Sequence, residues 1–223
     1  MQETLKKIRR EELSIALIWL FHVSGIIGIV YGDALWFIQA TPINLSLSFA
    51  LAIYNGWSSK HFVKLGILAF SAGMIAEILG VNFGWIFGDY AYGEMLGWKF
   101  LGVPWLIGAN WVILVVCTGQ IARDLVSSKI GQILVGVALM VLLDLLIEPM
   151  APRLDFWEFE GGQAPLQNYI GWALVALPLQ IFMHGYNVRP KGYFFHHLYL
   201  LQILFFTILL IKLNSITPFA AMS

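Results

Sequence analysis

Long apolar stretches separated by short polar connections dominate the chain. Seven of them approach the roughly 20 residues that an α-helix needs to cross the hydrocarbon core of a bilayer. The second stretch is interrupted by Pro42 and Asn44 and follows the first after a very short connection at Asp33, so six spans remain the alternative count. The seven predicted spans are 13–31, 34–55, 62–84, 103–122, 130–151, 166–187 and 194–213.

Basic residues gather in every second connection between these stretches. With the N-terminus in the cytoplasm, ten of the thirteen Lys and Arg residues fall on the cytoplasmic side, and only Lys99, Arg153 and Lys212 fall outside. This bias is the one that the positive-inside rule describes. It predicts a cytoplasmic N-terminus, an odd number of spans and a C-terminus on the opposite side.

The composition indicates the same environment. Hydrophobic residues make up 59% of the 223 residues and charged residues 12%, whereas soluble domains carry about 25% charged residues. No linker separates the apolar stretches, so we expect one transmembrane domain over residues 1–223, an all-α polytopic membrane helix bundle. Thirteen basic and thirteen acidic residues cancel, so a nucleic acid partner is not expected. The single cysteine, Cys117, lies in an apolar stretch and is interpreted as a packing residue.

Three carboxyl groups lie inside predicted spans: Glu77, Asp144 and Glu148. A charged side chain at this depth costs at least about 2.5–3.5 kcal/mol, so each one is a candidate functional residue. Glu77 and Asp144 each lie about 14 residues from the cytoplasmic start of their span, which places both at roughly 21 Å depth. Asp144 and Glu148 are four residues apart and share one helical face.

Asn110 reaches a similar level in the fourth span, counted from its outer end. The four polar groups are therefore predicted to line one cavity that opens towards the outer side. A cluster of buried carboxyl groups should keep at least one member protonated, which gives a Brønsted acid in an apolar cavity. The alternative is that these groups only join helices by hydrogen bonds.

Two predicted outer loops, 85–102 and 152–165, are long and rich in aromatic residues and glycine. We expect them to lie in the membrane interface as a lid or mouth, although an ordinary belt of interfacial aromatic residues would look similar. Asp89, Asn110 and Asn168 are candidates to hold water. The aromatic candidates for substrate binding and cation stabilisation are Trp85, Tyr90, Tyr92, Trp105, Trp111, Trp157 and Trp172.

The histidines do not predict a metal centre. The chain has five, His22, His61, His184, His196 and His197, and no HxxHH box. No metal and no cofactor is therefore expected. A retinal protein would need a lysine in the middle of the last span, whereas Lys212 lies at its end.

The polar cluster and its flanks resemble the carotenoid biosynthesis membrane family that contains carotenoid 1,2-hydratases and is related to membrane lycopene cyclases. The resemblance covers about residues 14–212. Its motifs are Glu77-Ile78-Leu79-Gly80-Val81, Gly84, Phe87-Gly88-Asp89-Tyr90-Ala91-Tyr92, Leu96-Gly97, Gly102-Val103-Pro104-Trp105, Asp144, Glu148-Pro149, Phe156-Trp157-Glu158-Phe159 and Ala164-Pro165-Leu166-Gln167-Asn168-Tyr169-Ile170-Gly171-Trp172.

The resemblance implies addition of water across the terminal C1–C2 double bond of an acyclic carotenoid end, of the lycopene or gamma-carotene type, without a cofactor. Glu77 or Asp144 would protonate C2, and the partner carboxylate with Glu148 would position and deprotonate the water. The implied partners are a carotenoid substrate, membrane lipid and other enzymes of the carotenoid pathway. The implied location is the bacterial inner (cytoplasmic) membrane.

Three other functions fit the same residues. A lycopene-type cyclase begins with the same protonation, but a neighbouring double bond captures the cation. A non-catalytic membrane protein that binds pigment or lipid would use the same aromatic cavity. A proton-coupled transporter would use the carboxyl groups as a relay, although the sequence has no visible inverted repeat.

Overall fold

The computed structural model describes residues 2–57 and 60–212, with side chains from residue 10 onwards. This part of the chain folds mainly into helices, with four short strands in the connections. The helices are α1 (Gln2–Tyr31), α2 (Ala34–Gln39), α3 (Thr41–Gly56), α4 (Lys60–Phe83), α5 (Trp105–Leu125), α6 (Lys129–Ile147), the 3₁₀ helix η1 (Pro152–Leu154), α7 (Leu166–Gly185) and α8 (Phe194–Ile211); the strands are β1 (Tyr90–Tyr92), β2 (Lys99–Phe100), β3 (Val103–Pro104) and β4 (Trp157–Phe159).

The described residues contain seven helical segments that are long and apolar enough to cross a membrane, which confirms the predicted helix bundle. The second segment, Ala34–Gly56, consists of α2 and α3. Its break follows from the sequence: Asp33 caps α2 by accepting a 3.1 Å hydrogen bond from the Trp36 amide, and Pro42 lies in the first turn of α3. Proline is tolerated in a first turn because it has no N–H to leave unpaired.

The predicted spans match the observed ones to within a few residues, and the largest difference is at the end of the fifth. This span was predicted to end near residue 151, but α6 ends at Ile147. Glu148 is the C-cap of α6, and its backbone N–H still donates to the Asp144 carbonyl at 2.9 Å. Pro149 cannot donate an N–H to a further helical turn, which is consistent with this end. Glu148 therefore lies just beyond the spanning segment, while Asp144 lies within it.

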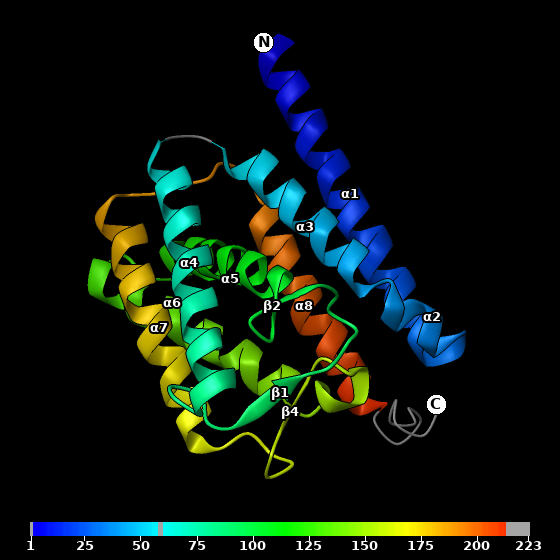
Figure 1. Cartoon of the computed structure of the whole chain (residues 1–223). Coiled ribbons are helices and arrows are strands. Elements are labelled where there is room, and N and C mark those ends of the chain that lie inside the picture. The colour runs from blue at the N-terminus through cyan, green and yellow to red at the C-terminus, as the bar shows by residue number, and fades with distance from the viewer. Residues whose placement is uncertain (1, 58–59, 213–223) are drawn as a thin grey trace.

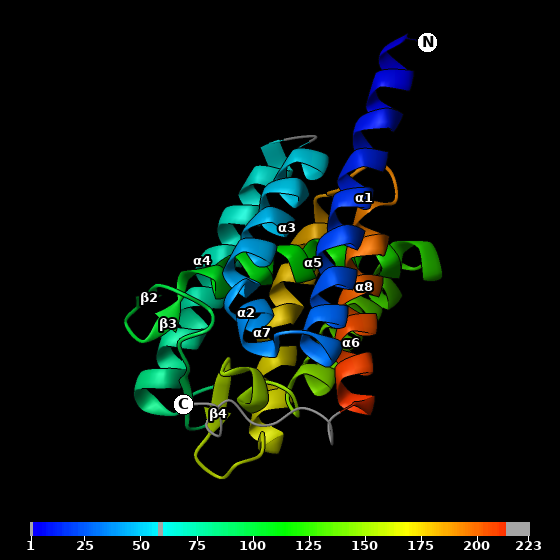
Figure 2. The same cartoon turned by 90° about the vertical axis from the view of Figure 1, so that its right-hand side faces the viewer.

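Helix α5 is the centre of the packing. It runs across the other long helices in both views (Figures 1 and 2) and packs against α3, α4, α6, α7 and α8. Of the 18 most apolar consecutive residues of α5, 78% are buried, whereas the corresponding share is 39% or less in every other spanning segment. A residue on α5 is therefore surrounded by several helices, which is the position needed for a buried site.

The two aromatic loops meet each other. Strands β1 and β4 pair antiparallel, with Tyr90 opposite Phe159 and Tyr92 opposite Trp157. The pair lies at the end of the molecule opposite the N-terminus, beside the lower ends of α4 and α7 in Figure 1. Strand β1 packs against α4, the helix that carries Glu77. The N-terminus, the end of α3, the start of α4 and the α7–α8 connection lie at the other end, whose cytoplasmic location remains a prediction.

Candidate active site

Glu77 is surrounded by three hydrogen-bond donors. Its Oε2 accepts from the Tyr90 hydroxyl at 2.5 Å and from the Tyr92 hydroxyl at 2.7 Å, and its Oε1 accepts from Trp111 Nε1 at 3.0 Å. The side chain is 4% exposed. Distances of about 2.5–2.7 Å are typical of O–H donors bonded to an ionised oxygen. Both Glu77 oxygens therefore accept hydrogen bonds from fixed donors.

Local sequence explains how the donors reach Glu77. Tyr90 and Tyr92 are two residues apart in β1, so both side chains leave the same face of the strand. Gly73 and Gly80 flank Glu77 on α4 and leave room for the rings: a Cβ at Gly73 would lie 2.4 Å from the Trp111 ring, and one at Gly80 would lie 2.7 Å from the Tyr90 hydroxyl. The two glycines therefore allow the aromatic rings to approach α4 closely.

A second polar group forms around Asn168 of α7. Its Nδ2 donates to Asp144 Oδ2 at 2.7 Å and to Glu148 Oε1 at 3.1 Å. Trp157 Nε1 donates to both Glu148 oxygens at 3.3 Å. Asn168 thus joins the Asp144 and Glu148 carboxyl groups. Asp144 Oδ1, in contrast, is buried without a partner among the described residues, so Asp144 has far fewer donors than Glu77.

A small cavity of about 30 Å³ lies between the two polar groups. This exceeds the roughly 10–15 Å³ that one water molecule requires. Glu77 and Glu148 both line it, whereas Asp144 lies behind them. Trp111 and Trp172 are stacked beside it, with ring centroids 4.4 Å apart. Its lining residues are Glu77, Phe87, Tyr90, Tyr92, Ile107, Asn110, Trp111, Ile147, Glu148, Trp157, Phe159, Asn168 and Trp172.

A larger cavity of about 120 Å³ adjoins the small one, since Ile107, Asn110, Ile147 and Trp157 line both. Its remaining walls come from α1, α2, α3, α8 and the outer loops. The walls are mainly apolar and aromatic, with Phe21, Phe37, Phe156, Phe205 and Phe206 among them.

The larger cavity also contains polar groups that lack partners. Asn44 Oδ1, Ser48 Oγ and Gln202 Oε1 are buried side-chain oxygens without a hydrogen-bond partner among the described residues. Buried polar atoms of this kind are normally satisfied by water or a ligand. The cavity therefore combines apolar walls with positions that can hold water.

Burial changes the acidity of the groups at the outer end. Burial and the neighbouring Glu77 carboxyl raise the pKa of Tyr90 and Tyr92, so both phenols remain donors at every physiological pH. Burial also raises the pKa of Glu148 to about 7, against the opposing effect of its hydrogen bonds from Trp157 and Asn168. Near neutral pH, Glu148 is thus available both as an acid and as a base.

The fold brings together most of the residues that the sequence singled out. Ten of the thirteen candidates line the small cavity or contact its carboxyl groups: Glu77, Asp144, Glu148, Asn110, Asn168, Tyr90, Tyr92, Trp111, Trp157 and Trp172. Three lie outside it. Asp89 is exposed, and the side chains of Trp85 and Trp105 are 59% and 51% exposed. Within residues 10–57 and 60–212, no group of three or more His, Cys, Asp or Glu residues has the arrangement of a metal site.

Sequence reasoning missed much of the larger cavity. Ser48, Gln202 and the phenylalanines of α1 and α8 were not selected, and His22 and Asn44 were noticed only as polar residues within spans. A polar residue inside an apolar stretch was the available signal. The phenylalanines carried no signal, because a lipid-facing and a cavity-facing phenylalanine look alike in a sequence.

Comparison with known proteins identifies the family of the chain. A protein relative named bisanhydrobacterioruberin hydratase, from Haloarcula japonica, is 32% identical in an alignment of 111 residues that covers 44% of this chain and 36% of the relative. The match thus spans about a third of the relative's length. No solved structure matches the chain significantly. The family model of carotenoid biosynthesis proteins matches residues 37–221, which include both polar groups and both cavities apart from the α1 wall. The chain therefore belongs to the carotenoid biosynthesis protein family.

Proposed function

We propose that this membrane protein is a carotenoid hydratase that adds water across the terminal C1–C2 double bond of an acyclic carotenoid end, of the lycopene or gamma-carotene type. One observation carries the proposal: two carboxyl groups, those of Glu77 and Glu148, line a water-sized cavity that adjoins a larger, mainly apolar one. Hydration of an unactivated alkene needs an acid, a water molecule and a dry setting for the cationic intermediate, and this arrangement supplies all three.

The substrate enters through the larger cavity. Its aromatic walls suit the flat methyl-branched polyene, and the side that it shares with the small cavity, at Asn110 and Trp157, brings the terminal double bond near the carboxyl groups. Only the end of the polyene fits in about 120 Å³, so the rest of the chain extends from the cavity between α1, α3 and α8.

Glu148 is the proton donor in this mechanism. It lines the small cavity, and its pKa of about 7 leaves much of it protonated at neutral pH. Transfer of its proton to C2 breaks the C1–C2 π bond and leaves a tertiary carbocation at C1. The indole N–H of Trp157 then stabilises the Glu148 carboxylate that remains.

Glu77 stabilises the cation. Three fixed donors keep it as a carboxylate at one wall of the small cavity, and a negative charge that is already in place needs no rearrangement when the cation forms. The stacked Trp111 and Trp172 rings add their π faces. Glu77 does not supply the proton, because its oxygens are occupied by donors.

Water completes the reaction. A water molecule between Asn110, Asn168 and Glu148 attacks C1, and its proton passes to the Glu148 carboxylate, which restores the acid. The net change is one water added and one tertiary hydroxyl formed, with no change in the enzyme. Asp144 is a positioning residue here, since it lies behind the cavity and acts through Asn168 and Glu148.

The proposal is tested by expressing the full chain in bacteria that accumulate lycopene or gamma-carotene and analysing the pigments. We expect products that have gained one water per acyclic end, with the hydroxyl oxygen taken from ¹⁸O-labelled water. Glu148→Gln should lower the conversion by about 10²–10⁴-fold, the usual size of a general acid–base contribution. Glu160→Gln is the matched control, because Glu160 is exposed in the outer loop, and it should convert like the parent.

Other products would indicate a different reaction. Cyclic isomers of unchanged mass would identify a cyclase, in which a folded polyene rather than water captures the cation. Hydroxyl oxygen derived from O₂ would contradict hydration altogether. An unchanged pigment in cells that contain folded protein would refute activity on these substrates.

A further inference from the structure

A second cavity with polar walls lies at the other end of α5, far from the carboxyl groups. Its volume is about 270 Å³, and it is lined by the C-terminal turns of α5, the loop before α8 and the first turn of α8. Twelve residues of helix separate Trp111 from Arg123, or roughly 18 Å at 1.5 Å per residue. This polar cavity is therefore separate from both cavities of the candidate active site. Its lining residues are Gln120, Arg123, Asp124, Arg189, Pro190, Gly192, Tyr193 and His196.

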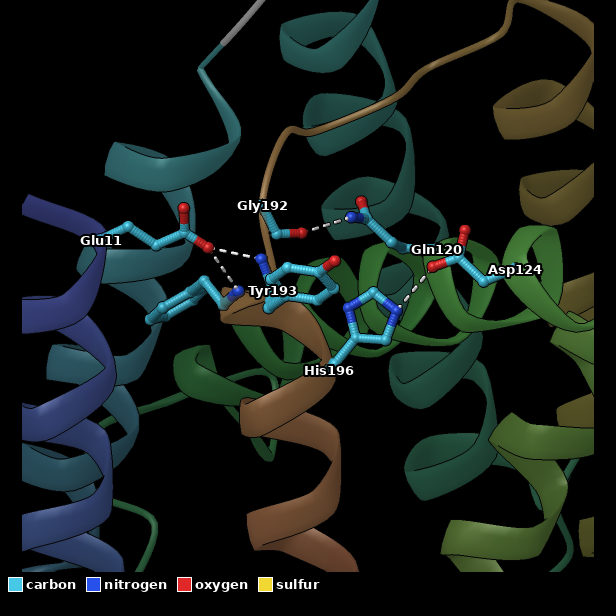
Figure 3. A network of polar contacts seen from close by, with 7 residues as sticks. Glu11, Gln120, Asp124, Gly192, Tyr193 and His196 are labelled. Carbon is cyan, nitrogen blue, oxygen red and sulfur yellow. Dashed lines mark hydrogen bonds and ion pairs between the residues drawn. The ribbon is translucent and has the colours of Figure 1, made fainter. Parts of the chain in front are cut away.

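Two arginines give the cavity its positive charge. Arg123 Nη1 donates to the Val188 carbonyl at 3.1 Å, while Arg123 Nη2 is buried without a partner among the described residues. Arg189 is exposed at the rim. Neither forms an ion pair with a carboxylate of the described residues. Asp124, the only acidic lining residue, is paired with His196 at 2.8 Å (Figure 3). Two guanidinium groups thus line the cavity, and the carboxylate of its one acidic lining residue is held by His196.

The walls are held in place by a network of hydrogen bonds (Figure 3). Gln120 Nε2 donates to the Gly192 carbonyl at 2.9 Å, which fixes the loop to α5. Glu11 of α1 accepts from the backbone N–H groups of Tyr193 and Phe194. Because Glu11 already occupies these N–H groups of α8, a ligand in the cavity must be recognised by the arginines. Gln120 Oε1, on a side chain that is 8% exposed, is left without a partner.

The surroundings favour a lipid over a free ion. Leu200 lies one turn beyond His196 on the same face of α8 and is 44% exposed, and Tyr193 at the cavity rim is 70% exposed. An exposed apolar side chain on a spanning helix therefore lies one turn from the cavity. A volume of about 270 Å³ is below the roughly 300–1,000 Å³ of pockets that enclose a drug-sized ligand, so a headgroup fits while the acyl chains stay outside.

We propose that this cavity binds the phosphate of an anionic glycerophospholipid, with Arg123 and Arg189 donating to the phosphate oxygens and Gln120 Oε1 accepting from a headgroup hydroxyl. Planar guanidinium groups match the geometry of phosphate oxygens. Basic pockets between spanning helices are suitable sites for anionic headgroups. The site is independent of the proposed hydratase reaction.

The test is native mass spectrometry of the full chain in detergent, titrated with phosphatidylglycerol, phosphatidylcholine or inorganic phosphate. We expect phosphatidylglycerol to bind at least tenfold more tightly than phosphatidylcholine. Arg123→Gln and Arg189→Gln should each weaken phosphatidylglycerol binding by about tenfold, and Arg189→Gln loses no hydrogen bond of the described structure, so it should stay folded. Lys129→Gln is the matched control: it removes the same charge from the exposed start of α6, the helix that follows α5, outside the lining of the cavity.

Each other outcome overturns the proposal. Equal binding of the two lipids would show that the cavity does not select an anionic headgroup. Displacement of phosphatidylglycerol by millimolar inorganic phosphate would assign the arginines to a soluble anion. An equal loss of binding in Lys129→Gln and Arg189→Gln would mean that lipid responds to the overall charge of this end and not to the cavity.

Discussion

The environments of Glu77 and Asp144 predict opposite responses to the same chemical change. Glu77→Gln and Asp144→Asn each replace a buried carboxyl group by an amide of equal size, so residue size alone predicts that both variants remain stable. The hydrogen bonds separate them. Glu77 accepts from three donors, whereas Asp144 accepts from Asn168 through one oxygen and has no partner for the other.

The magnitude follows from counting acceptors. A glutamine has one accepting oxygen and an NH₂ group, so if its oxygen faces the two tyrosines, its NH₂ faces the Trp111 N–H and that donor loses its partner. An unsatisfied buried donor costs about 1–3 kcal/mol, and each phenol loses about 1 kcal/mol when its acceptor becomes neutral. The total for Glu77→Gln is roughly 3–5 kcal/mol. Asp144→Asn keeps its bond from Asn168 and should cost only about 0–1 kcal/mol.

The assay is thermal unfolding of the purified variants in one detergent, followed by tryptophan fluorescence and by the fraction that remains monodisperse. At about 2–4 °C per kcal/mol for a chain of this size, Glu77→Gln should unfold about 10 °C below the parent. Asp144→Asn should unfold within about 3 °C of it.

Equal melting temperatures for the two variants would refute this reasoning. They would mean that Glu77 is protonated in the parent, because a neutral acid already has one oxygen that carries a proton, and an amide can replace it at little cost. Glu77 would then return as a candidate proton donor. A lower melting temperature for Asp144→Asn than for Glu77→Gln would contradict the hydrogen-bond geometry itself.

Three further predictions follow from the same site and from the topology. Gly80→Ala should cost about 1–3 kcal/mol of stability, because its Cβ would lie 2.7 Å from the Tyr90 hydroxyl, whereas Gly66→Ala on the same helix meets Val112 at 3.9 Å and should be neutral or stabilising in thermal unfolding. Conversion should fall as the pH rises through about 7, where Glu148 loses its proton, and a pH–rate profile that is flat from pH 6 to 8 would contradict its role as the acid. Reporters fused to the two termini should lie on opposite sides of the membrane, because seven spans require it, and two cytoplasmic reporters would show that one segment, Ala34–Gly56 first of all, does not cross.

The sequence by itself determined the features that depend on position along one helix. Apolar stretches of about 20 residues identified the spans, because the cost of burying polar side chains in hydrocarbon acts on each segment separately. The rise per residue predicted one depth for Glu77 and Asp144, and the helical repeat predicted one face for Asp144 and Glu148. These calculations need no knowledge of neighbouring helices, and the structure brings all three carboxyl groups to one site.

Only the tertiary structure decided how the carboxyl groups differ. The pairing of β1 with β4 joins loops that lie more than 60 residues apart, and it brings Tyr90 and Tyr92 to Glu77 and Trp157 to Glu148. Such pairing depends on contacts between distant segments, which leave no periodic pattern in the sequence. For the same reason, the sequence did not separate Trp111 and Trp172, which stack beside the small cavity, from Trp85 and Trp105, which are exposed. The sequence around an aromatic residue does not show whether its side chain faces lipid or a cavity, because the neighbouring segments of the fold set its orientation.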